Sequence, residues 1–66
     1  MIVLKVTLPA GRSDEVKREL HHRLTDAAVE AFGVDVNDVR SVIYEAPPLH
    51  WARSGIPLAD VDPRDW

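Results

Sequence analysis

Two short segments rich in β-branched residues flank one helical segment, and this order constrains the fold more than any other feature of the sequence. Over residues 2–8 hydrophobic side chains alternate, which is typical of a strand with one apolar and one mixed face. Residues 39–46 form a second such segment, which ends before Pro47 and Pro48 because proline cannot donate a ladder hydrogen bond. Strands joined through a helix lie parallel, with a right-handed crossover. The sequence therefore predicts an α/β chain with a single β-α-β unit.

The helix between these strands is predicted over residues 14–32. Ser13 is a suitable N-cap, and Asp14 and Glu15 place negative charge at the positive end of the helix dipole. Gly33 permits the left-handed conformation with which many helices end. Apolar residues recur every three or four positions, which predicts one apolar helix face. These residues are Val16, Leu20, Leu24, Ala27, Ala28 and Ala31.

The rest of the chain predicts only short elements. Asp35 can cap one further short turn before the second strand. Residues 49–54 are expected to form a loop or helical turn, and residues 56–58 a short extended piece, so the C-terminal part holds a small hairpin. We assign residues 1–58 to the β-α-β domain and residues 59–66 to a loosely ordered C-terminal arm, which is expected to dock on a neighbour.

The size of the chain predicts association with other chains. A chain of 66 residues buries a modest share of its surface when it folds alone. It has no cysteine, so disulfides and thiolate metal sites are excluded, and the spacing of its 3 histidines predicts no metal pair. Two strands covered by one helix also leave one sheet face and both edges open. We therefore expect an oligomer without metal.

Charge and hydropathy exclude two classes of partner. The net charge is −3, from 8 Lys and Arg against 11 Asp and Glu, and the sequence has no basic patch of the kind that binds nucleic acid. No apolar run approaches the length of a membrane span, and the first residues do not have the charge order of a secretory signal. We expect a cytoplasmic protein without nucleic-acid or membrane partners.

Three motifs resemble those of one enzyme family. Residues 8–17 read Leu-Pro-Ala-Gly-Arg-Ser-Asp-Glu-Val-Lys, the second strand carries an arginine near its start, and Pro47-Pro48 precedes Trp51. This combination resembles the 4-oxalocrotonate tautomerases, and the register holds from residue 1 to about residue 58. The resemblance implies a hexamer built as a trimer of dimers, with active sites shared between subunits and no cofactor. The implied ligand is a small carboxylate or oxo-acid.

The resemblance assigns site residues position by position. Arg12 corresponds to the arginine that binds the far carboxylate of the substrate. Arg40 corresponds to the arginine, usually from another subunit, that binds the near carboxylate and the oxo group. Trp51 corresponds to an aromatic residue of the apolar pocket. The position of the family's catalytic base, an amino-terminal proline, is occupied by Ile2.

The replacement of proline by Ile2 leaves only a backbone amine as a catalytic base at this end of the chain. Methionine is normally removed only before a small residue, so we expect Met1 to remain. Its amine is then displaced by up to about 3.8 Å along the chain, and a displacement of about 1 Å can cost roughly 100-fold in rate. If Met1 is removed, the amine of Ile2 lies where the proline nitrogen would be.

Each assignment also has a purely structural alternative. Arg12 could form a surface ion pair with Asp14 or Glu15, which stabilises little. Arg40 could form a salt bridge across subunits or an anion site, and the sequence favours neither. Trp51 could be an interface anchor. Histidines and the tyrosine are assigned to packing or solvent: His21, His22, His50 and Tyr44.

The turn after Trp51 departs from the family pattern. Ala52 and Ser54 occupy positions where the family commonly has glycine, and only Gly55 remains. If those positions need positive φ, each replacement costs about 1 kcal/mol, so we expect a re-shaped loop. Arg53 is expected to face solvent rather than substrate.

Three functions remain open on the sequence. The chain could be a tautomerase of small unsaturated oxo-acids that uses a terminal primary amine and is weak alone. It could instead be a non-catalytic subunit that lends its arginines and tryptophan to a proline-bearing homologue in a hetero-oligomer. It could also bind an anion without turnover. We favour tautomerase chemistry by analogy of fold and motif.

Overall fold

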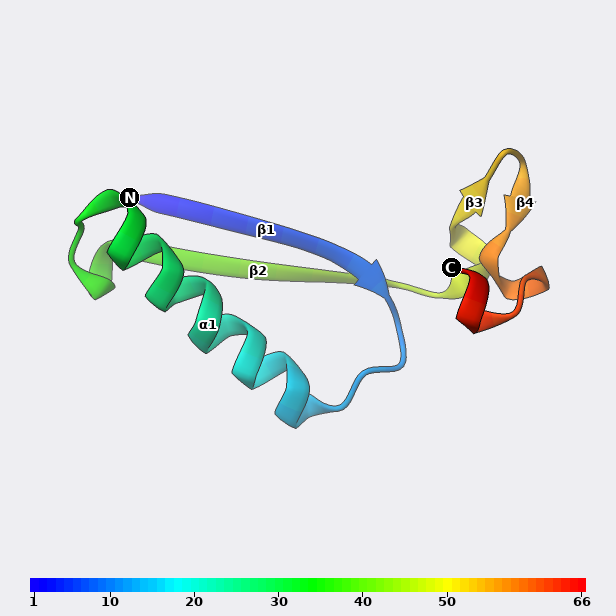
Figure 1. Ribbon diagram of the computed structural model, residues 1–66, viewed down its shortest axis with the longest axis horizontal. Helices are drawn as coiled ribbons and strands as arrows, with labels where there is room; N and C mark the ends of the chain where they lie inside the picture. The colour runs from blue at the N-terminus through cyan, green and yellow to red at the C-terminus, as the bar shows by residue number, and fades with distance from the viewer.

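The computed structural model describes all residues from Met1 to Trp66 and contains the predicted β-α-β unit (Figure 1). Strand β1 spans Ile2–Pro9, helix α1 spans Asp14–Phe32 and strand β2 spans Val39–Ala46. The two strands pair in parallel, from Ile2 opposite Val39 to Pro9 opposite Ala46. A small antiparallel hairpin follows, with β3 at Ala52–Arg53 and β4 at Ile56–Pro57. The predicted fold class is confirmed.

Local side-chain chemistry fixes both ends of α1. The Ser13 hydroxyl accepts a hydrogen bond from the Val16 amide at 3.2 Å, as an N-cap does. At the other end Gly33 has a φ of 64°, and its amide donates to the Val29 carbonyl at 2.9 Å. Asp35 then caps the short 3-10 turn Val36–Asp38, as its side chain accepts from the Asn37 amide. The predicted helix boundaries are confirmed at both ends.

The helix covers only one face of the sheet. Lys17 and His21 of α1 reach β2, where they hydrogen-bond to Glu45 and Ser41. Side chains alternate along a strand, and paired residues of parallel strands share a face. The opposite face therefore carries Val3, Lys5 and Thr7 from β1 and Arg40, Val42 and Tyr44 from β2, and none of the helices or strands covers it.

The single subunit has almost no core. Only Ala28 and Val39 are buried, and three members of the predicted apolar helix face, Val16, Ala27 and Ala31, stay exposed. The radius of gyration is 14.8 Å, whereas a compact domain of this length has about 11 Å. The surface of 5082 Å² exceeds the roughly 4,200 Å² expected of a compact monomer of this mass. Such a chain needs partners to cover its apolar surface.

The hairpin closes with a tight turn rather than a re-shaped loop. Arg53 pairs with Ile56, so Ser54 and Gly55 alone connect the strands. Their φ values are 55° and 82°, as a two-residue turn of the type that matches strand twist requires. Ser54 therefore carries a cost of about 1 kcal/mol, whereas Ala52 lies in β3 without positive φ. The expectation of a re-shaped loop was wrong, because Ser54 adopts the left-handed conformation despite this cost.

The tail beyond the hairpin contains two short helical turns. Two 3-10 turns, Leu58–Asp60 and Pro63–Asp65, fold it back along the hairpin (Figure 1). The indole N–H of Trp66 donates to the carbonyls of Leu58 and Val61, at 3.0 and 3.3 Å. The end of the arm 59–66 is thus hydrogen-bonded to its own chain, and its docking on a neighbour stays a prediction. No helix of the structure combines the length and the apolar character that a membrane span requires.

Candidate functional site

The predicted site residues lie in two groups at opposite ends of the sheet. Met1 and Arg40 lie where the two long strands begin, while Arg12 and Trp51 lie beyond the ends of those strands (Figure 1). The 8 residues of β1 separate the groups, which corresponds to about 25 Å of extended chain. One subunit therefore does not bring all of these residues together.

The hairpin end of the molecule contains a cleft of about 450 Å³, which we call the hairpin cleft. It brings Arg12 and Trp51 of one subunit together. Its lining combines the end of β1, the turn before α1, the hairpin and the tail. The lining residues are Thr7, Pro9, Arg12, Trp51, Ala52, Arg53, Leu58 and Trp66.

Arg12 and Trp51 are both held by backbone carbonyls. One Nη of Arg12 donates to the Pro9 carbonyl at 3.2 Å, and the side chain pairs with neither Asp14 nor Glu15. The indole N–H of Trp51 donates to the Ala46 carbonyl at 3.2 Å, and its ring is half-buried. The guanidinium of Arg12 thus keeps most of its donors for a ligand, beside the apolar surface of an indole.

Two lining residues of the hairpin cleft were not among the predicted site residues. Arg53 is exposed to solvent, as expected, and it also lines the cleft from β3. Trp66 enters the lining because the tail folds back. The signal for this fold was the Asp62-Pro63 pair, since Asp62 caps the last turn by accepting from the Arg64 amide at 2.9 Å.

The other predicted residues, Met1 and Arg40, lie where the two long strands begin, and Arg40 is on the uncovered sheet face. Met1 is 85% exposed. Arg40 lies beside Val3 in the register, and one of its Nη atoms donates to the carbonyls of Asn37 and Val39, at 2.6 and 3.2 Å. No carboxylate of the same chain pairs with Arg40. This end therefore holds an exposed cation and an exposed backbone amine.

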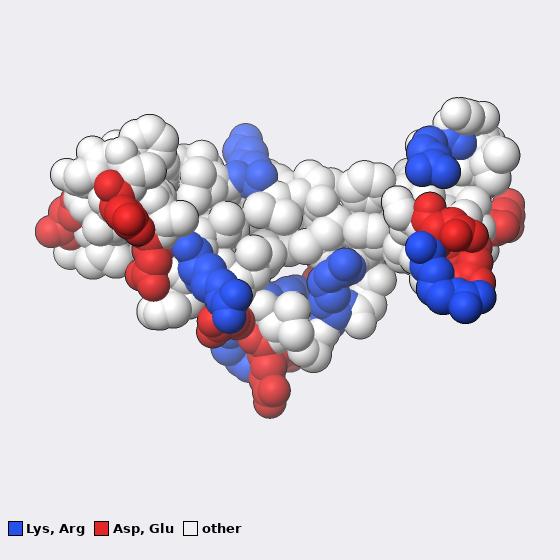
Figure 2. Space-filling model, in the orientation of Figure 1, with Lys and Arg blue, Asp and Glu red and all other residues white.

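The basic side chains differ in ion pairing, and the arginines of both candidate groups are among those that form no ion pair, as are Lys5 and Arg18. Lys17, Arg23 and Arg64 each form an ion pair with an acid, whereas Arg12, Arg40 and Arg53 form none. In Figure 2 a basic side chain stands over the hairpin, and acidic and basic side chains mix over the last turns. An unpaired guanidinium in a cleft is a ready partner for a carboxylate.

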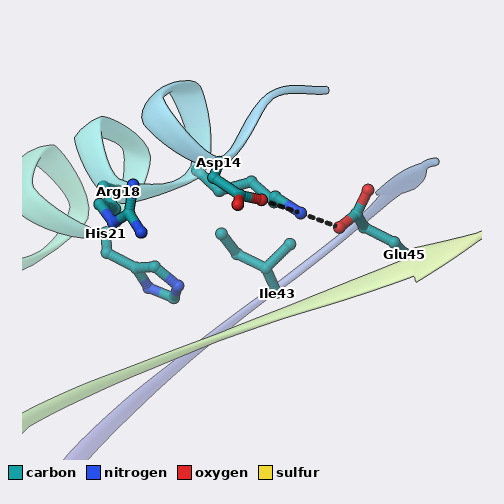
Figure 3. Close-up of a pocket in the computed structure, with 6 residues that line it drawn as sticks. Asp14, Arg18, His21, Ile43 and Glu45 are labelled. Atoms are coloured by element: carbon teal, nitrogen blue, oxygen red, sulfur yellow. Dashed lines mark hydrogen bonds and ion pairs between the residues drawn. The ribbon is translucent and has the colours of Figure 1, made fainter. Parts of the chain in front are cut away.

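A second cleft of about 350 Å³ lies between α1 and β2 and holds none of the predicted residues (Figure 3). Lys17 spans it, with its Nζ 2.7 Å from Glu45 and 3.5 Å from Asp14. The hydrogen bond to Glu45 raises the pKa of Lys17 above its ordinary value. The ion pair between Lys17 and Glu45 therefore links the helix to the strand, whereas Arg18, which also lines this cleft, forms no ion pair. No group of three or more metal-ligating side chains gathers anywhere in the structure.

Comparisons with known proteins give a consistent picture. The sequence profile of the family described as "Tautomerase enzyme" matches residues 3–61. A probable tautomerase of Ralstonia nicotianae is 42% identical over 67 residues, which cover 98% of this chain and 96% of that protein. The 2-hydroxymuconate tautomerase of Comamonas testosteroni is 37% identical over 46 residues, which cover 70% of this chain and 73% of that one.

Among solved structures, the heterohexamer 4-oxalocrotonate tautomerase from Chloroflexus aurantiacus J-10-fl superimposes with a TM-score of 0.88 and 44% identity. The match covers 94% of this chain and 100% of that chain. The fold and the geometry define a class of protein: a small β-α-β subunit that carries arginine at both ends of its sheet. This chain belongs to the tautomerase family.

Proposed function

We propose that this chain forms oligomers whose shared sites isomerise small unsaturated oxo-acids by enol–keto proton transfer. One observation carries the proposal: the unpaired Arg40 lies at one end of the sheet and the unpaired Arg12 and Arg53 lie at the other, about 25 Å away. Neither group alone can bind both ends of a small substrate. In an oligomer, the hairpin cleft of one subunit would meet the Arg40 end of another.

The chemistry assigns one role to each group. Arg12 would bind the carboxylate far from the reacting centre, and Arg40 of a neighbouring subunit the near carboxylate and the oxo oxygen. Trp51 would cover the unsaturated chain with apolar surface. A neutral backbone amine at Met1 or Ile2 would take the enol proton and return a proton to carbon. The reaction moves one proton and one double bond, so it consumes no co-reactant.

The amine is the weak element of this site. Ile2 supplies no proton-transfer group of its own, and a retained Met1 would place the primary amine up to about 3.8 Å from the position it should occupy. Such a displacement of the amine lowers the rate of proton transfer by orders of magnitude. We therefore expect measurable but slow turnover by this chain alone.

A second function is favoured by two observations. Ile2 lacks the secondary amine of proline, and a structural relative at 44% identity is described as a heterohexamer. In a mixed oligomer, this chain would lend Arg12 and Trp51, or Arg40, to a partner that carries an amino-terminal proline. The chain would then be inactive alone and would raise the rate of that partner.

Turnover by the purified chain distinguishes the two functions. The assay follows ketonisation of 2-hydroxymuconate by absorbance, beside an intact-mass measurement that reports whether Met1 is present. Arg40→Ala should reduce turnover at least about tenfold, because a charged group loses its partner. Arg23→Ala is the matched control, since Arg23 is exposed on α1 and pairs only with Glu19. Wild-type turnover equal to buffer would refute the self-sufficient enzyme and favour the mixed oligomer.

A further inference from the structure

The hairpin cleft has a second wall that the proposed chemistry does not use. Arg12 and Trp51 form one side, while Arg53 and Trp66 reach the same cleft from the hairpin and the tail. The wall depends on two local features. The tight turn at Ser54 and Gly55 fixes β3, and the last 3-10 turn carries Trp66 back toward the hairpin.

Both tryptophans present ring surface rather than hydrogen-bond donors to a ligand. The indole N–H of Trp51 is bound to the Ala46 carbonyl, and that of Trp66 is bound to the carbonyls of Leu58 and Val61. An indole has no other polar atom. Trp66 nevertheless remains 41% exposed. What it offers is therefore a flat apolar surface that its hydrogen bonds hold in place.

The charges of the hairpin cleft are not balanced by its own residues. Its lining contains Arg12 and Arg53 and no acidic side chain. Arg64, which lies in the nearby tail, is neutralised by Asp62 through hydrogen bonds of 2.8 and 3.1 Å. Two guanidinium groups beside two indoles define a site for an anion with a flat body, because arginine binds carboxylates and aromatic surfaces bind planar groups.

We propose that Arg53 and Trp66 determine the specificity of the hairpin cleft, which selects carboxylic acids bearing a flat conjugated or aromatic group over short or non-planar acids. The inference rests on the proposed function, because Arg12 and Trp51 belong to the same cleft. The volume of about 450 Å³ is large enough for such a ligand. Arg53 would hold the carboxylate jointly with Arg12, and Trp66 would stack on the planar group.

Equilibrium binding tests this without any turnover. The probes are trans-cinnamate, 3-cyclohexylpropanoate and acetate, which share a carboxylate and differ in the body attached to it. Cinnamate has no enol, so its binding is independent of the terminal amine and of tautomerase activity. Dissociation constants are measured by calorimetry on the full-length oligomer as purified. Wild-type protein should bind cinnamate more tightly than either other acid.

The variants separate the two residues. Trp66→Ala should weaken cinnamate binding roughly fivefold, the size of one aromatic contact, and leave acetate unchanged, while Trp66→Phe should retain most of the affinity. Arg53→Gln should weaken cinnamate and acetate alike, by roughly fivefold to tenfold. Arg23→Gln, on the far side of α1, is the charge-matched control and should change neither.

The outcomes distinguish this inference from the proposed function. If Arg12→Gln reduces cinnamate binding while Trp66→Ala and Arg53→Gln do not, the second wall has no role and the inference is overturned. Equal affinity of wild-type protein for cinnamate and 3-cyclohexylpropanoate also overturns it. A failure of the proposed function would show instead as absent ketonisation, both by the pure chain and by its mixture with a proline-bearing homologue. Circular dichroism establishes that each variant is folded.

Discussion

Tyr44 gives the sharpest prediction about assembly. It lies on the sheet face that no element of its own chain covers, and it is 50% exposed. An aromatic side chain buries about 150–250 Å² in full, so half of Tyr44 offers about 100 Å² to a partner. At about 25 cal/mol per Å², its removal from an interface costs about 2.5 kcal/mol for each subunit. This corresponds to a roughly 70-fold weaker association.

The variant to make is Tyr44→Asp, because a carboxylate buried without a partner adds to that loss. Sedimentation velocity over a dilution series should show the assembly dissociating at concentrations at least about 70-fold higher than for wild-type protein. Arg23→Asp is the control, since it places the same carboxylate on the exposed side of α1. An unchanged sedimentation profile for Tyr44→Asp would refute the argument that this sheet face is an interface.

Three further predictions concern the turn, the tail and the base. Ser54→Gly should raise the free energy of unfolding by about 0.5–1 kcal/mol, measured with denaturant, because it removes a side chain from a left-handed residue. The side-chain and backbone hydrogen bonds from Arg64 hold the pKa of Asp62 below its usual range. The hydrogen bonds of Asp62 therefore stabilise the last turn fully at pH values above the unfolded pKa of about 3.9. This stabilisation is lost as the pH falls through the lower pKa of the folded state. The chemical shift of the Trp66 indole N–H should move to that of an unfolded chain over this acid range and stay constant at higher pH. Ile2→Pro, which also favours removal of Met1, should raise turnover by about two orders of magnitude; unchanged turnover with the methionine removed would contradict the assignment of the base.

The β-α-β unit was predictable because its determinants are local. Alternation along the strands, the Ser13 cap and the Gly33 stop each act within a few residues, and all of them hold in the structure. The proximity of Arg12 and Trp51 within one subunit was not predicted, since nothing in the local pattern relates the turn before α1 to the segment after β2.

The second wall of the cleft was not predictable in the same way. Arg53 lines the cleft because Ser54 tolerates positive φ, which replaced the expected re-shaped loop by a tight turn. Trp66 reaches it through hydrogen bonds to Leu58 and Val61, which depend on the path of the whole tail.

Complementation between two inactive chains tests the shared site most directly. Arg12→Ala and Arg40→Ala chains are unfolded together, refolded as a mixture and assayed for ketonisation beside each chain alone. If each site takes Arg12 from one subunit and Arg40 from another, random mixing restores about a quarter of the sites, and activity should rise to that fraction of wild type. A mixture no more active than the separate variants would contradict the shared site, because both arginines would then have to come from one chain.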